Sequence, residues 1–201
     1  VRTGKSTFIK RFMDVMVIPS IQDENVRARL TDELPQSAAG RTIMTTQPRF
    51  IPNEAATLEI ENTRIKIRMA DCVGYMVEGA VGHVENNAPR MVRTPWFDYD
   101  IPFEDAAEIG TNKVITEHST IGIMVTTDGS ITDIKRPAYV DAEERVIAEL
   151  KNTGRPFIVL VNSTDPCGAE ATELAAALSE KYGLSVDPDA IIEDTTVGMQ
   201  Q

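Results

Sequence analysis

The side chains best suited to chemistry stand at the beginning of the chain, in the order Thr3-Gly4-Lys5-Ser6-Thr7. This order is the second half of G-x-x-x-x-G-K-[ST], a loop whose backbone N–H groups cradle phosphates. Its lysine reaches the β- and γ-phosphates, its hydroxyl binds Mg²⁺, and the helix behind it points its N-terminus at the anion. The alternative is a surface turn with this order by chance. We predict a phosphate site formed by Arg2, Thr3, Gly4, Lys5, Ser6 and Thr7.

A second candidate group is Asp71-Cys72-Val73-Gly74, directly after a segment of alternating apolar and polar residues. Loops of this type pair with a carboxylate that ends a strand and holds Mg²⁺. Asp71 is therefore predicted as a catalytic metal ligand beside Ser6, and the N–H of Gly74 as a contact of the γ-phosphate. The alternative is that Asp71 only caps a turn.

Between these groups lies a loop with Thr42, Thr45 and Thr46. In GTPase-like proteins a threonine here completes the Mg²⁺ shell and senses the γ-phosphate. Thr45 and Thr46 are favoured because they lie nearer the following strand, and Thr45 is the predicted metal ligand. The alternative is an ordinary polar loop.

Base recognition in this class uses Asn-Lys-x-Asp after a buried strand, and the chain has Asn162-Ser163-Thr164-Asp165 there. Asn162 is expected to tie this motif to the phosphate loop, and Asp165 to bind the base. The missing lysine weakens the case for strict GTP specificity. Tyr75 stands where Ras-like proteins have the glutamine that orients the attacking water. Hydrolysis is therefore expected to be slow or to borrow a group from elsewhere.

Composition narrows the class of protein. A net charge of −11 argues against non-specific nucleic-acid binding, and 42% apolar residues are ordinary for a folded domain. Two distant cysteines imply no disulfide framework. Neither histidine has partners at ligand spacing, so a transition-metal site is not expected. The carboxylates of Asp141, Glu143 and Glu144 are expected on a solvated helix face.

The elements that must position these groups alternate between β and α. A helix is predicted after the first turn, a long loop over 20–48, and a hairpin from strands 57–61 and 65–69. An irregular stretch over 75–102 follows, then a helix to about His118. Strands at 120–126 and 156–161 then alternate with helices ending near Gly154 and at Gly183, and 184–201 gives only weak signals. This order predicts a three-layer α/β fold of the P-loop NTPase, GTPase-like (TRAFAC) type. Its sheet is expected to be mostly parallel, with one antiparallel hairpin and the first strand missing.

The chain resembles the stage IV sporulation protein A family, the spore-coat morphogenetic ATPases of endospore-forming bacteria. The resemblance covers about residues 1–183. Several stretches carry it: 1–10, 32–46, 71–75, 89–91, 94–96, 107–111, 117–122 and 126–130.

The resemblance implies that ATP and Mg²⁺ are the cofactors and that ATP hydrolysis drives self-assembly into the basement layer of the coat. It also implies a place in the mother-cell cytoplasm, at the outer surface of the forespore. Expected partners are other copies, a small amphipathic membrane-anchoring peptide and other coat morphogenetic proteins. By the same resemblance, contact with the membrane surface is expected to be only indirect.

Residues 1–183 are accordingly predicted as an N-terminally truncated nucleotide domain, followed by a poorly defined tail over 184–201. The family's regions for membrane targeting and assembly are expected outside this sequence. Two other functions stay open: a GTPase switch of the translation-factor-like class, and a scaffold that binds nucleotide without turnover.

Overall fold

The computed structural model describes residues 1–35, 47–60, 63–184 and 192–193. The chain begins with a short loop and helix α1 (Lys5–Phe12), which continues through a π-helical segment (Met13–Val17) and a 3-10 turn (Ile18–Ser20). This is the helix predicted after the phosphate loop. Its apolar residues Ile9, Met13 and Val17 recur at helical spacing and are buried.

Helix α2 (Glu24–Glu33) lies within 20–48, where a long loop was predicted, so that prediction is wrong. Asp23 caps the helix by accepting hydrogen bonds from the N–H groups of Asn25 and Val26. Many charged residues hide the helical pattern in the sequence. The helix buries Leu30 in a core that it shares with α1 and the hairpin.

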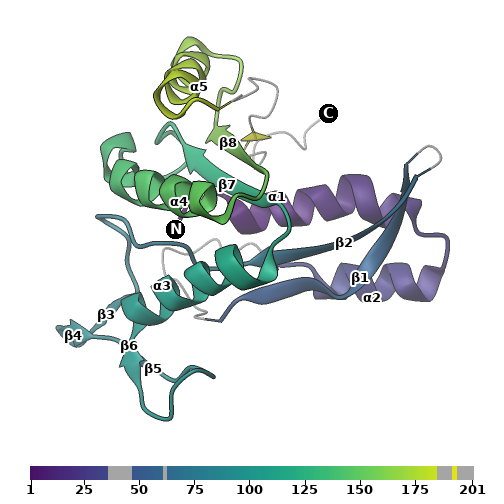
Figure 1. Cartoon of the computed structure of the whole chain (residues 1–201), viewed down its shortest axis with the longest axis horizontal. Helices are drawn as coiled ribbons and strands as arrows, with labels where there is room; N and C mark the ends of the chain where they lie inside the picture. Colours follow the sequence, from purple (N-terminus) through teal and green to yellow (C-terminus); the bar gives the residue numbers. More distant parts are fainter. Residues whose placement is uncertain (36–46, 61–62, 185–191, 194–201) are drawn as a thin grey trace.

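The predicted hairpin is confirmed and longer than expected. Strand β1 (Arg49–Ile60) pairs antiparallel with β2 (Thr63–Asp71), and the register is irregular between Ile51 and Ala56. Helices α1 and α2 pack on it through Ile9, Leu30 and Ile51 (Figure 1). The hairpin places Asp71 at the end of a strand.

A second sheet holds three parallel strands in the order β7-β8-β9: β7 (Gly122–Thr127), β8 (Phe157–Ser163) and β9 (Ile192–Glu193). Strand β9 lies in the segment 184–201, in which no strand was expected, and that part of the prediction is wrong. Its pairing covers only Asn162–Ile192 and Ser163–Glu193, too short a run to leave a periodic pattern.

Helices connect the parallel strands as predicted. Helix α3 (Phe103–Lys113) continues as a π-helical segment (Val114–His118) into β7; α4 (Val140–Thr153) leads to β8, and α5 (Ala169–Tyr182) follows it. Glycines in the left-handed conformation end α4 and α5. Helix α4 packs on β7 and β8 through Leu150, and α5 on β8 through Ala175 and Leu178.

The stretch predicted as irregular contains two small antiparallel pairs. Strand β3 (Val84–Glu85) pairs with β4 (Ala88–Pro89), and β5 (Met91–Val92) with β6 (Ile101–Pro102). They project from the rest of the chain below α3 (Figure 1).

A cavity of about 590 Å³ separates the hairpin from the parallel sheet. Consecutive residues of β2 and of β7 line it, together with Phe8 and Phe12 of α1 and with Leu150 of α4. The other edges of the two strands are paired, β2 with β1 and β7 with β8. An apolar slot therefore lies between two strand edges.

Candidate functional site

The loop before α1 has the backbone of an anion-binding turn. Arg2 and Gly4 have φ values of +58° and +91°, and Gly4 caps the helix, with its carbonyl oxygen accepting from the N–H of Phe8 at 2.8 Å. The N–H groups of the first helical turn have no acceptor within their own helix. They belong to Lys5, Ser6 and Thr7, the residues predicted to meet phosphate.

Asn162 fastens this loop to the end of β8. Its Nδ2 donates to the carbonyl oxygen of Thr3 at 3.2 Å, and its side chain is fully buried. A methyl group on Gly4 would lie 2.3 Å from the same nitrogen. The close approach therefore needs a glycine at this position, and the structure brings Asn162 to the loop as the sequence led us to expect.

Two of the three predicted metal ligands, Ser6 and Asp71, meet at the amino end of α1. The hydroxyl of Ser6 donates to Oδ2 of Asp71 at 2.5 Å, across two elements far apart in the sequence. Hydroxyl and carboxylate oxygens are ligands that Mg²⁺ accepts, with waters and phosphate oxygens completing its shell. Among the described residues, no three histidine, cysteine or acidic side chains gather to hold a metal without such help.

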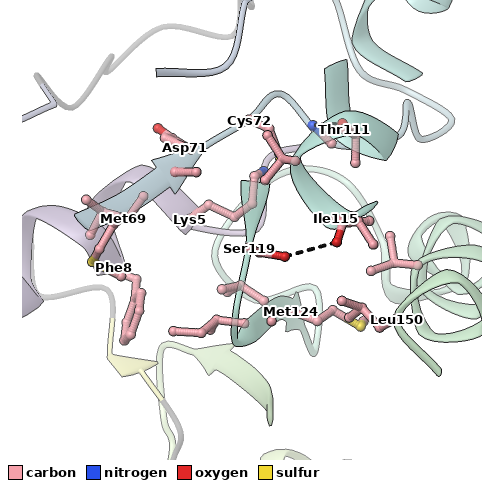
Figure 2. Close-up of a pocket in the computed structure, with 18 of the residues that line it drawn as sticks. Lys5, Phe8, Met69, Asp71, Cys72, Thr111, Ile115, Ser119, Met124 and Leu150 are labelled. Atoms are coloured by element: carbon pink, nitrogen blue, oxygen red, sulfur yellow. Dashed lines mark hydrogen bonds between the residues drawn. The ribbon is translucent and has the colours of Figure 1, made fainter. Parts of the chain in front are cut away.

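Lys5 extends from α1 toward the turn after β2. A methyl group on Gly74 would lie 3.4 Å from its Nζ. Figure 2 shows Lys5, Asp71, Cys72 and Thr111 at one end of the cavity, and Phe8, Met69, Met124 and Leu150 around its apolar part. Burial raises the pKa of the Cys72 thiol, and the Lys5 ammonium opposes that shift only in part.

The N–H of Gly74 donates to Oγ1 of Thr111 on α3 at 3.1 Å. We predicted this N–H as a contact of the γ-phosphate, and here a protein hydroxyl occupies it. The sequence did not point to Thr111, because a threonine inside a helix carries no signal for such a contact.

Tyr75 is buried with its side chain against α4. Its hydroxyl donates to Glu149 at 2.5 Å, and the guanidinium of Arg145 lies 3.9 Å above its ring. Burial and the neighbouring carboxylate of Glu149 raise the pKa of Tyr75 above its usual range. A neutral phenol held in this way has no free hydroxyl with which to orient a water.

The motif Asn162-Ser163-Thr164-Asp165 at the end of β8 differs from base-reading loops in the role of its second residue, Ser163. Ser163 is buried and its hydroxyl donates to Oδ2 of Asp128 at 2.5 Å. Burial acts to raise the pKa of Asp128, but hydrogen bonds from Ser130 and Ser163 outweigh it and hold the pKa below its usual value. Ser163 therefore ties two loops together at the place where a lysine would cover the base.

Asp165, the predicted base contact, is exposed. A methyl group on Gly168 would lie 2.5 Å from its Oδ2, so the carboxylate folds toward the start of α5. Arg2 offers its carbonyl oxygen to the hydroxyl of Tyr139 at 3.3 Å, and Thr7 is half-buried in α1. Thr42, Thr45 and Thr46 lie outside the described residues.

Glu143 was expected on a solvated face, and that is wrong. It is buried, accepts from Thr126 at 2.8 Å and from Tyr182 at 3.1 Å, and forms an ion pair with Arg136 at 2.8 Å. Its polar partners come from other elements, which a helical pattern alone does not reveal. In the described part of the chain, no helix has the length and apolar character needed to cross a bilayer.

A family model described as "Stage IV sporulation protein A, ATPase domain" matches residues 1–198. Proteins named Stage IV sporulation protein A are 56% identical in Bacillus anthracis and 57% in Bacillus subtilis (strain 168), each over 92% of this chain and 38% of the relative. The protein of that name in Clostridioides difficile (strain 630) is 53% identical over 96% of this chain and 40% of its own length. The chain thus spans about two fifths of these relatives. No solved structure gives a significant match.

Proposed function

The chain belongs to the stage IV sporulation protein A family, as an ATPase domain of sporulation proteins, and from this premise we propose that it binds and hydrolyses ATP with Mg²⁺ at the loop before α1. The observation that carries the proposal is the 2.5 Å hydrogen bond between Ser6 and Asp71 beside Lys5. The fold brings these groups together by placing the loop beside the end of β2.

Each residue has a definite task in this proposal. The N–H groups at the start of α1 and the ammonium of Lys5 bind the phosphates. Ser6 and Asp71 would hold Mg²⁺, and the ion would supply positive charge beside the phosphate oxygens. Thr45 would complete the metal shell and Thr46 would sense the γ-phosphate, while Asn162 keeps the loop in shape by holding Thr3.

The test is a competition titration of labelled ATP against unlabelled ATP and GTP, with and without Mg²⁺, on the full-length protein. We expect ATP to be preferred, because Ser163 is engaged with Asp128 and no lysine covers the base. A preference for GTP would mean that Asp165 reads guanine and would move the protein to the GTPase switch class.

A nucleotide-binding scaffold without turnover is the second candidate. The contact of Tyr75 with Glu149 favours it, because the residue after Gly74 has no free hydroxyl to orient a water. Phosphate release measured against a Lys5→Ala control separates the two functions. Release no faster than in the control would establish the scaffold.

We further propose that hydrolysis drives self-assembly of the coat basement layer around the forespore, in the mother-cell cytoplasm. The membrane would be reached through a small amphipathic anchoring peptide, and other coat morphogenetic proteins would dock on the layer. The family resemblance supports this step. Sedimentation of the full-length protein with ATP, and with an analogue that resists hydrolysis, tests it: equal polymer in both would overturn the role of hydrolysis.

The slot between β2 and β7 supports the finer assignment to the GTPase-like P-loop class. We propose that a strand leading into Val1 fills it and joins both sheets. Val1 borders the slot, and its backbone nitrogen donates to the carbonyl oxygen of Tyr75 at 3.0 Å, beside the carboxyl end of β2. A strand ending there would run parallel to both neighbours, with apolar side chains toward α1 on one face and α4 on the other.

Two isoleucines test this strand in the full-length protein. Ile123 on β7 lines the slot and is 36% exposed, whereas Ile158 on β8 is 46% exposed and does not line it. Ile123→Asp should destabilise the nucleotide domain far more than Ile158→Asp, because the strand would bury the new carboxylate. Equal losses of stability would contradict the strand.

A further inference from the structure

Two neighbouring residues of helix α3, Gly110 and Thr111, contact Pro48 and the turn after Asp71. Oγ1 of Thr111 on α3 accepts a hydrogen bond from the N–H of Gly74 at 3.1 Å, and Thr111 as a residue is only 3% exposed. Thr111 therefore holds the turn after Asp71 through this hydrogen bond.

The preceding residue, Gly110, packs against Pro48 and Trp96. A methyl group on Gly110 would lie 3.4 Å from Cδ of Pro48, which leads into β1, and 3.1 Å from Cη2 of Trp96. Pro48 follows Thr45 and Thr46 closely in sequence. A shift of α3 at Gly110 and Thr111 would thus move the turn at Gly74, Pro48 and Trp96, the only tryptophan of the chain.

A backbone N–H makes one strong hydrogen bond, so Gly74 can serve Thr111 or a phosphate oxygen fully, but not both. Lys5 already points to this place, since a methyl group on Gly74 would lie 3.4 Å from its Nζ. A γ-phosphate bound by Lys5 would arrive beside the N–H that Thr111 now occupies. ADP, which lacks that group, would leave the contact intact.

We propose that Thr111 is a positioning residue that competes with the γ-phosphate for the N–H of Gly74, so that ATP, and not ADP, releases α3 from the turn. This inference rests on the proposed function. The released helix carries the change to Pro48 and Trp96 through Gly110. The position of α3, next to the projecting pairs β3–β4 and β5–β6 (Figure 1), would thereby differ between the ATP-bound and ADP-bound protein.

Substitutions at Thr111 test the competition in the full-length protein. Thr111→Val keeps the shape and removes the acceptor, so ATP no longer displaces a hydrogen bond. The ratio of ATP to ADP affinity should rise roughly two- to tenfold, the worth of one net hydrogen bond. Thr111→Ser keeps the hydroxyl and should leave the ratio unchanged. Thr116→Val, an exposed substitution of the same kind in the helical segment after α3, is the matched control.

If Thr111 only supports the fold, Thr111→Val lowers the affinities for ATP and ADP together and the ratio of ATP to ADP affinity stays the same. An unchanged ratio would overturn the proposal. Hydrogen exchange of 92–113 in the wild-type protein gives a second measure that needs no variant. Exchange should rise with a non-hydrolysable ATP analogue and not with ADP; equal exchange would also overturn the proposal. If the wild-type protein binds neither nucleotide, the proposed function fails instead.

Discussion

Replacing Gly4 by alanine should weaken nucleotide binding for two separate reasons. Gly4 has a φ of +91°, in the left-handed region that an alanine occupies at a cost of about 1–2 kcal/mol. In addition, the new methyl group would lie 2.3 Å from Nδ2 of Asn162. The buried amide must then leave the carbonyl oxygen of Thr3, which removes a hydrogen bond worth about 1 kcal/mol.

Together these effects cost about 2–3 kcal/mol whenever the loop takes the form seen here. If phosphate binding requires this loop conformation, the loop of the Gly4→Ala variant adopts another conformation in the absence of nucleotide. The free-energy cost of returning to the binding conformation then lowers the affinity for nucleotide. Affinity for ATP and ADP should then fall roughly thirty- to a hundredfold, because each 1.4 kcal/mol is a factor of ten. Fluorescence titration with a labelled nucleotide measures both affinities in the full-length protein.

An Asn162→Ala background separates the two causes. There the clash and the hydrogen bond are both absent, so Gly4→Ala should cost only the backbone strain, roughly five- to thirtyfold in affinity. Gly183→Ala is the matched control: Gly183 has a φ of +63° with nothing within 4 Å of an added methyl, and it ends α5, away from the loop. Equal effects of Gly4→Ala in both backgrounds would refute the role assigned to Asn162.

Three further predictions concern the metal, the buried carboxylate and the thiols. Asp71→Asn can still accept from Ser6 but carries no charge, so it should remove most of the Mg²⁺ dependence of ATP binding; binding that still depends on Mg²⁺ as in the wild type would count against the metal role. Glu143→Ala leaves Arg136 without its buried partner and should lower stability by about 3–5 kcal/mol, measured by urea titration; a loss below 1 kcal/mol would show that the pair contributes little. Burial raises the pKa of the Cys72 thiol, so a smaller fraction of Cys72 than usual is thiolate at pH 8. A thiol reagent should therefore label the exposed Cys167 first, and Cys72 should react faster as the pH rises further. Labelling of Cys72 before Cys167 would contradict the burial of Cys72.

The sequence predicted those parts of the fold in which local pattern and tertiary packing agree. The helix after the loop, the hairpin that ends at Asp71, and the strands followed by helices ending at Gly154 and Gly183 are confirmed. In each, apolar residues recur at the period of the element. The pairing of Ser6 with Asp71 could be anticipated because the loop motif and a strand-ending carboxylate constrain each other.

The rest depends on contacts that leave no periodic trace. Helix α2 was missed because charged side chains hide its single buried leucine, and β9 because its pairing with β8 is so short. Thr111 and Glu143 were missed or misplaced for a related reason. Their polar partners come from elements distant in sequence, and a helical pattern reports only which face is apolar.

Two departures from the usual GTPase pattern have the same structural outcome. Tyr75 stands where a glutamine would orient water, and it is bonded to Glu149 on α4. Ser163 stands where a lysine would cover the base, and it is bonded to Asp128 after β7. Each side chain is held by a carboxylate of a neighbouring element, so neither is free to serve the nucleotide.

Under the proposed function, this arrangement suits slow hydrolysis of ATP better than a switch that cycles quickly. If so, a substitution that restores a water-orienting side chain should remove the packing contacts that Tyr75 now makes. Tyr75→Gln would gain a side chain able to orient water, but it would leave Glu149 without its buried phenol and Arg145 without the ring beneath its guanidinium. Turnover that rises while the thermal midpoint falls would fit this exchange. A variant with faster turnover and unchanged stability would show that Tyr75 is not held for the sake of the fold.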